Sequence, residues 1–141
     1  MEMVKKLNRI NLAKIFSIIF IITLFVGAVG ASINFQGVNF NIPDDFNKSG
    51  VVRDFNDLGS EGKTCRYING SNEIIEITVV SDWMGMSLDD LHQDKASSTS
   101  IKGHDGWGFK KDNLYCFSYM DDDKGIIVGV SDKSLLNQII V

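Results

Sequence analysis

His104, Asp105 and Cys116 are the residues whose types could support nucleophilic catalysis. His104 and Asp105 are adjacent, and Cys116 follows His104 by twelve residues. A thiol nucleophile needs a base within hydrogen-bonding reach and a third group that orients this base. These residue types therefore give one functional hypothesis, a small hydrolase with a reactive Cys116. The spacing does not show that these three side chains meet. The second histidine of the chain, His92, is expected to be solvated on the outer side of a predicted helix.

Cys65 and Cys116 are the two cysteines of the chain, and both fall in predicted strands. In an oxidising exterior an even number of cysteines predicts a disulfide. This link would close a loop of about 50 residues and stabilise the fold by about 2–4 kcal/mol. The alternative is a pair of separate buried thiols that act as small apolar side chains. Since a disulfide explains Cys116 better than catalysis does, the sequence favours no catalytic residue.

Metal and cofactor motifs are missing from the sequence. A closed zinc site would need both histidines and both cysteines together, and their spacing fits no familiar ligand pattern. Asp121–Asp123 could offer oxygens to calcium, but the run lacks the central Gly and terminal Glu of a calcium loop, which favours a solvated turn. The chain also has no Gly-rich phosphate loop, nucleophile elbow or metalloprotease histidine pair. We therefore expect no metal and no cofactor.

Two further sets of residues are candidates for modification and for binding. Asn47-Lys48-Ser49 and Asn69-Gly70-Ser71 match the acceptor pattern for N-glycosylation, and both lie in predicted turns. The aromatic and Met side chains that could form an adaptable binding surface are Trp83, Met84, Met86 and Trp107. Core filling beneath the first predicted helix is the alternative role for this second set.

The N-terminus has the composition of a secretory signal peptide. Residues 1–14 contain four basic residues and one acid, and Ile15–Val26 is almost wholly apolar. Val29 and Ala31 are small residues at the −3 and −1 positions of a cleavage site before Ser32; cleavage after Gly30 is the close alternative.

An uncleaved membrane anchor is the rival interpretation of the same segment. Ile15–Ala31 is 17 residues long, the lower limit for crossing a hydrocarbon core of about 30 Å. The basic flank stays on the cytoplasmic side in either case, so the rest of the chain is exported. The sequence thus predicts residues 1–31 as signal peptide or anchor and residues 32–141 as a single extracytoplasmic domain.

Net charge differs sharply between these two parts. The whole chain of 141 residues has 14 basic and 18 acidic residues. Residues 1–31 hold four of the basic residues and one acid, which leaves ten basic and seventeen acidic residues and a net charge of −7 in the exported part. An acidic domain without a clustered positive footprint argues against nucleic acid as a partner.

Alternating apolar residues predict strands in the exported part. Tyr115, Phe117 and Tyr119 share one face, and a polar turn at Asp121–Gly125 separates them from an alternating Ile126–Val130, which is typical of a hairpin. The other predicted strands are Lys63–Ile68 and Glu73–Val80 on either side of Asn69–Asn72, a glycine-weakened strand at Ile101–Lys110, and an alternating run of Val38, Phe40 and Ile42 that ends at Pro43. Residues 47–62 give no clear pattern.

Two helices complete the expected fold. Asp132 is suited to cap a helix that carries Leu135, Leu136, Ile139 and Ile140 on one face, and Ser87 is suited to cap another that begins at Leu88. The predicted fold class is α+β, an antiparallel sheet of about five to six strands with two helices packed on one face, preceded by an N-terminal signal or anchor helix.

The chain resembles small exported proteins of methanogenic archaea. The resemblance is carried by the lysine-led leader, by Val38–Phe46, and by the ending with Tyr115–Tyr119, Gly125–Val130 and Asp132–Ile140. It implies export and an α+β domain, and it implies no site residues because that group has no assigned function. The two cysteines are not part of the shared pattern.

Three functional hypotheses follow from the sequence. The leading one is a non-catalytic cell-surface or secreted domain that binds or supports a partner in the envelope. The alternatives are the small extracytoplasmic hydrolase built on His104, Asp105 and Cys116, and an accessory subunit of a membrane complex held by an uncleaved Ile15–Ala31.

Overall fold

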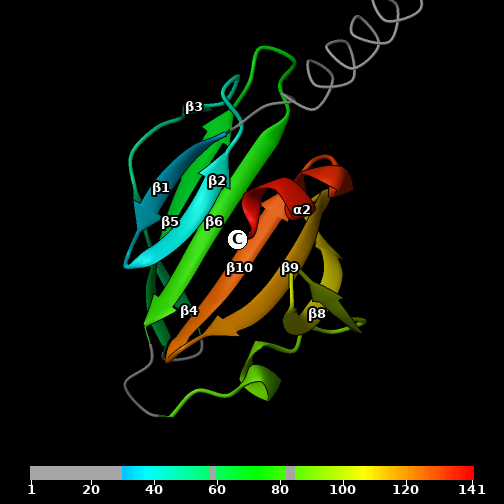
Figure 1. The fold of residues 1–141 in the computed structure, drawn as a ribbon. Coiled ribbons are helices and arrows are strands. Elements are labelled where there is room, and N and C mark those ends of the chain that lie inside the picture. Colours follow the sequence, from blue (N-terminus) through cyan, green and yellow to red (C-terminus); the bar gives the residue numbers. More distant parts are fainter. Residues whose placement is uncertain (1–29, 58–59, 82–84) are drawn as a thin grey trace, which may run out of the picture.

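A computed structural model describes residues 30–57, 60–81 and 85–141. These residues form ten strands, one short α-helix and two 3-10 turns (Figure 1). The strands are β1 (Ala31–Phe35), β2 (Val38–Ile42), β3 (Asn47–Lys48), β4 (Arg53–Asp57), β5 (Ser60–Ile68), β6 (Ile74–Ser81), β7 (Ser97–Ile101), β8 (His104–Lys111), β9 (Leu114–Asp121) and β10 (Lys124–Val130). The 3-10 turns are η1 (Leu88–Leu91) and η2 (Lys133–Leu135), and α2 spans Leu136–Ile139.

Eight strands make one large antiparallel sheet. Its order is β3-β5-β6-β10-β9-β8-β7, and β4 also pairs with β5, beyond the end of β3. The central contact joins β10 to β6, which are far apart in the sequence. β1 and β2 form a separate hairpin that lies against one face of the large sheet (Figure 1).

Two-residue turns close four of the hairpins. Gln36-Gly37, Lys102-Gly103 and Asp112-Asn113 adopt positive φ at both residues, as the tight turns that match strand twist require. Asp122-Asp123 closes the β9–β10 hairpin with a positive φ at Asp122. These short loops fix the register of every strand from β7 to β10.

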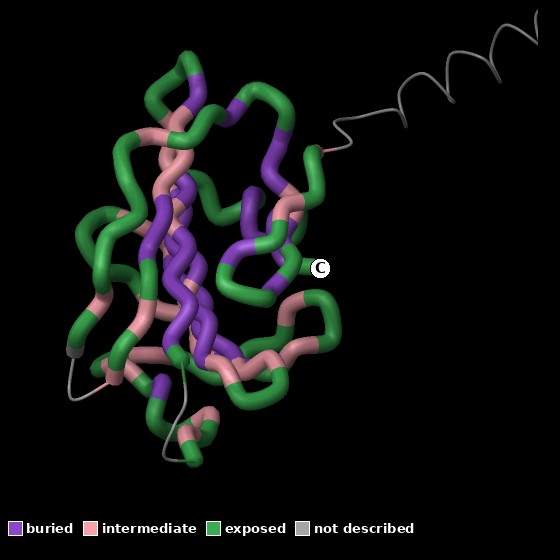
Figure 2. The backbone as a smooth tube through the Cα atoms, turned by 90° about the vertical axis from the view of Figure 1, so that its left-hand side faces the viewer, coloured by how far each residue is buried: buried purple, intermediate pink, exposed green. Residues whose placement is uncertain are grey.

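The core lies between the large sheet and the layer formed by the β1–β2 hairpin and the C-terminal segment (Figure 2). Directly opposed residues of neighbouring strands share a face, so Ile77, Val128 and Phe117 form one row across the middle of the sheet. Phe40 packs against them from β2 and is fully buried. Its bridge to Ile140 joins the hairpin to the C-terminal segment. We call this side of the sheet the core face and the opposite side the second face.

The predicted α+β class is wrong, because the described residues are mostly strand. The Ser87 segment forms only the turn η1, since its apolar spacing ends at Leu91 and the chain turns at Lys95, where φ is 60°. The C-terminal segment makes two short turns and is already extended at Ile140. The two segments also lie on opposite faces: η1 contacts the second face and α2 the core face.

Several local predictions are confirmed. The Tyr115–Tyr119 and Ile126–Val130 runs pair as β9 and β10, and Lys63–Ile68 pairs with the strand that follows the Asn69 turn. The Asp132 side chain accepts a hydrogen bond from Ser134 N, as the capping prediction requires. The predicted strand Ile101–Lys110 is wrong at its start, because Lys102-Gly103 is a turn between β7 and β8.

Residues 47–62, which gave no clear pattern, form β3, β4 and the start of β5. The predicted signal or anchor helix lies outside the described residues, apart from Gly30 and Ala31. In the part of the chain that is described, no helix is long and apolar enough to cross a membrane.

Candidate functional site

Two rows of side chains cross the second face of the large sheet. The first row crosses the neighbouring strands β5, β6, β10, β9 and β8 and consists, in that order, of Arg66, Glu76, Gly129, Cys116 and Phe109. The second row lies beside it and consists of Arg53, Thr64, Thr78, Ile127 and Ser118, from β4 to β9. Strand register alone therefore gathers charged, hydroxyl and thiol groups from four strands, β4, β5, β6 and β9, on one surface.

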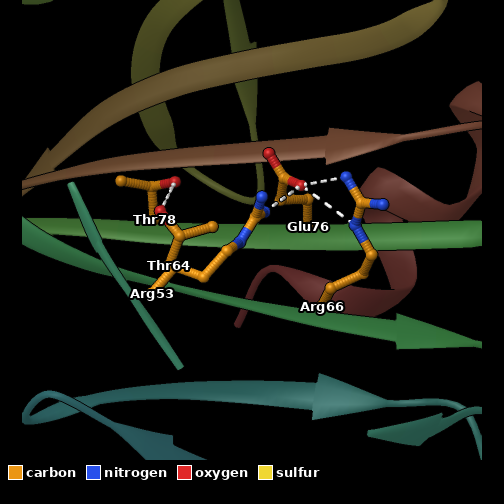
Figure 3. A network of polar contacts seen from close by, with 5 residues as sticks. All are labelled: Arg53, Thr64, Arg66, Glu76 and Thr78. Atoms are coloured by element: carbon orange, nitrogen blue, oxygen red, sulfur yellow. Dashed lines mark hydrogen bonds and ion pairs between the residues drawn. The ribbon is translucent and has the colours of Figure 1, made fainter. Parts of the chain in front are cut away.

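Glu76 accepts hydrogen bonds from two arginines (Figure 3). Arg66 donates from Nε at 3.1 Å and from Nη2 at 2.7 Å, and Arg53 donates from Nη2 at 3.0 Å. All three bonds end on Glu76 Oε2 and none on Oε1. The other carboxylate oxygen therefore keeps its acceptor capacity.

Thr64 and Thr78 form a buried hydroxyl pair next to this network. Their Oγ1 atoms are 2.8 Å apart, and the two residues are 6% exposed each. One hydroxyl donates to the other, so the pair uses one of its two hydroxyl hydrogens and leaves the second for another acceptor. Figure 3 places this pair beside Glu76 on the same side of the sheet.

A hollow of about 300 Å³ lies over these two rows. Phe55 on β4 forms part of one wall, and Phe109 and Leu114 form part of the opposite wall. Gly129 keeps the floor open, since a Cβ built there would lie 3.3 Å from both Cys116 Sγ and Leu114 Cδ1. Two basic and three acidic residues line it, namely Arg53, Lys111, Asp54, Glu76 and Asp112. The hollow thus combines apolar walls, a polar floor and nearly balanced charge.

Cys116 lines the hollow but is a poor nucleophile. Burial, followed by the nearby Glu76 carboxylate, raises the pKa of its thiol to about 11. The thiolate is the reactive form, so at neutral pH this sulfur is protonated and unreactive.

The predicted hydrolase set is not assembled in the structure. Cys116 faces the second face, whereas His104 lies on the core face, where its ring is 4.6 Å from that of Tyr119. His104 Nε2 is 2.9 Å from the carbonyl oxygen of Val141. Asp105 follows His104 on the same strand and so points to the opposite side. Hence Cys116 has neither residue arranged as base and orienting group.

The two cysteines are not brought together either. Cys65 lies on the core face of β5 and Cys116 on the second face of β9, with β6 and β10 between these strands. Three strand spacings amount to roughly 14 Å, whereas a disulfide needs Cα atoms within about 7 Å. Both are free, buried thiols here. The arrangement corresponds to the alternative interpretation, in which each thiol packs as a small apolar group.

The two predicted glycosylation sites differ in environment. Asn47 is exposed on β3. Asn69 is buried, and its Nδ2 donates to Asp45 Oδ2 at 3.1 Å and to Glu73 Oε2 at 2.6 Å. Its Oδ1 accepts from the backbone N–H groups of Ser71 and Glu73. The Asn69 amide therefore holds the β5–β6 turn together, and both of its hydrogens are engaged.

The structure describes two of the four residues of the predicted Trp and Met surface, Met86 and Trp107. Trp83 and Met84 lie outside the described residues. Trp107 Nε1 donates to the carbonyl oxygen of Leu88 at 2.9 Å, and Met86 lies so close to Gly125 that a Cβ there would be 2.8 Å from its sulfur. These two side chains attach the segment around η1 to the second face of the sheet.

Comparisons with known proteins give no relative. No family model, curated protein or solved structure matches the chain. Among the described residues, no group of three or more His, Cys, Asp and Glu side chains could hold a metal ion. A proposal about function therefore rests on the structure and the sequence of this chain alone.

Apart from Cys116, the residues of this hollow were missed in the sequence, although one signal pointed to some of them. The β5–β6 hairpin was predicted, and its register places Arg66 opposite Glu76 and Thr64 opposite Thr78. Opposite charges and paired hydroxyls across two strands are favourable cross-strand pairs. Arg53 and Phe55 gave no such signal, because β4 lies in the segment that had no clear pattern.

Proposed function

We propose that this protein is an exported, non-catalytic binding domain that holds a small polar ligand in the hollow on the second face. The observation that carries the proposal is that the floor of the hollow holds one hydrogen-bond acceptor and one donor that protein groups leave available to a ligand. Glu76 Oε1 receives no hydrogen bond from the two arginines, and the Thr64–Thr78 pair keeps a donor hydrogen. A ligand that offers a hydroxyl or amide group can bond to both at once.

Charge and shape narrow the class of ligand. The lining charges nearly balance, so the hollow has no strong field that would select a phosphate or a cation. Phe55, Phe109 and Leu114 offer apolar walls to the rest of the molecule. Small-molecule sites commonly combine apolar walls with a few placed polar groups. We therefore propose an uncharged ligand with one apolar side and neighbouring hydroxyl or amide groups.

Support for export comes from the composition of residues 1–31. Support for a non-catalytic role comes from Cys116 and His104, which face opposite sides of the sheet, and from the raised pKa of the Cys116 thiol. The expected partner is a component of the cell envelope, with the leader either cleaved or retained as an anchor.

The test is mass spectrometry of the protein recovered from its native host under non-denaturing conditions. We expect a bound small molecule on the wild type that is reduced about tenfold or more in Glu76→Gln. An amide is uncharged and has a single acceptor oxygen, so the two arginines and the ligand would compete for it, and its NH2 group would donate where the carboxylate accepts. The matched control is Glu61→Gln. Glu61 is an exposed residue of β5 that does not line this hollow, so the variant should retain the ligand. Equal occupancy in both variants would refute the proposed site.

A further inference from the structure

Strand β7 is the open edge of the large sheet. It pairs with β8 on one side, and no described strand pairs with its other side. Ile101 and His104 flank a two-residue turn and form a hydrogen-bonded pair, so the ladder alternates along β7 from that point. The N–H and C=O groups of Ser98 and Ser100 consequently point away from β8, toward the open side.

This edge has few of the features that protect sheet edges. Natural edge strands are blunted by charged side chains, Pro, bulges or short length. β7 is short, but its sequence is Ser-Ser-Thr-Ser-Ile, without charge or Pro, and its first four residues are exposed. The opposite edge is protected: β3 and β4 are separated by Ser49–Val52, where Gly50 has a φ of 74°, and each carries a basic residue, Lys48 or Arg53.

A groove of about 760 Å³ runs beside β7 on the core face. Gly108 on β8 contributes no side chain to it, and Tyr115, Phe117 and Leu136 form its apolar part. A strand added to β7 would direct every second side chain toward this groove. Backbone pairing and side-chain burial are therefore available at the same place.

The charge of the groove is opposite to that of the domain. Lys95, Lys110 and Lys133 line it together with one acid, Asp94, whereas residues 32–141 carry a net charge of −7. Lys95 and Lys133 form no ion pair within the described part of the chain. Complementary charge directs association and selects the partner. The groove therefore attracts an acidic segment, whereas the acidic remainder of the domain surface repels one.

We infer that β7 binds an extended acidic segment of another polypeptide, which adds to the large sheet as an antiparallel or parallel edge strand. Main-chain hydrogen bonds to Ser98 and Ser100 hold the segment, and its acidic side chains meet Lys95 and Lys133. This surface is separate from the hollow on the second face, so it does not depend on the proposed function.

The test measures binding of the full chain to a synthetic peptide of about eight alternating Glu and Val residues. We expect binding that weakens about tenfold or more when Lys95 and Lys133 are both changed to Glu, and that weakens as NaCl rises from about 0.05 to about 0.5 M. A peptide with Lys in place of Glu is the matched control and should bind at least about tenfold more weakly.

Two variants test the strand addition itself. Ser100→Pro removes an outward N–H, which an edge strand tolerates, and should abolish binding while thermal unfolding stays near that of the wild type. Gly108→Val fills the groove, and Gly108→Ala is its control, since a Cβ there meets Thr99 Cγ2 at 3.4 Å, an ordinary contact. Binding that survives both Ser100→Pro and Gly108→Val, or that is equal for the Glu and Lys peptides, would overturn the inference. Self-association through β7, detected by sedimentation and abolished by Ser100→Pro, would overturn it in favour of a second copy.

Discussion

Arg53 on β4 extends across β5 to Glu76 on β6, so that its Nη2 lies 3.0 Å from Glu76 Oε2. This contact and the pair between Arg66 and Glu76 link three strands on the second face. The Arg53 side chain is 55% exposed and that of Glu76 is 27% exposed. Solvent therefore screens the outer ion pair more than the inner one.

Removing these charges should have unequal effects on stability. We expect Arg53→Ala to lower the free energy of unfolding by about 0.5 kcal/mol, as for exposed ion pairs. Glu76→Ala should cost more, about 1–2 kcal/mol, because it leaves both arginines without their acceptor. Urea denaturation measures both values, and a larger loss for Arg53→Ala than for Glu76→Ala would contradict this order.

The two buried thiols should make stability fall at high pH. Burial, as the main cause, raises the pKa of Cys65 and of Cys116 from 9.0 to about 11. A folded-state pKa above the unfolded one stabilises the fold fully below about pH 9, and this contribution is lost as pH rises through 11. Two pKa units correspond to roughly 2–3 kcal/mol for each thiol.

The measurement compares the wild type with the double variant Cys65→Ala, Cys116→Ala by urea denaturation between about pH 8 and pH 11. The wild type should lose more stability over this range than the variant. Iodoacetamide should modify neither thiol of the folded protein at neutral pH and both after unfolding. An intact mass lower by two hydrogens, without intermolecular links, would instead support the disulfide predicted from the sequence.

Asn47 and Asn69 form a natural pair for testing what each sequon does. Asn69→Ala should lower the free energy of unfolding by about 2 kcal/mol, because four hydrogen bonds around a buried amide are lost. Asn47→Ala, at an exposed position, should cost less than about 0.5 kcal/mol. We also expect that any glycan is attached to Asn47. A glycan found on Asn69 by peptide mapping would contradict this expectation and would show that the Asn69 side chain was modified before the turn folded.

Sequence patterns gave the strands that have a strict period of two. Ile75, Ile77 and Val79 alternate, as do Ile126, Val128 and Val130, because each strand buries one face in the core. The cap at Asp132 was also predictable, since it depends only on Ser134, two residues away. These features rest on local chemistry, which neighbouring residues determine.

Other features depend on contacts between distant segments. The pairing of β10 with β6 decides which second-face residues meet, and nothing near either strand specifies it. The sequence predicts longer helices than the structure contains, because capping residues start a helix but do not extend it, and only packing on an apolar face does so. The sequence predicts a strand through Lys102-Gly103, because a glycine in a strand and a glycine in a tight turn look alike in sequence.

Gly106 and Gly70 provide a final test of how closely the sheet is packed. A Cβ on Gly106 would lie 2.2 Å from the carbonyl oxygen of Ser118 and 2.6 Å from the Phe117 ring, so backbone or core must shift to admit it. We expect Gly106→Ala to cost about 3 kcal/mol or more. Gly70→Ala meets nothing within 4 Å and should change stability by less than about 1 kcal/mol. Similar melting temperatures for the two variants would mean that β8 and β9 do not approach each other as closely as described.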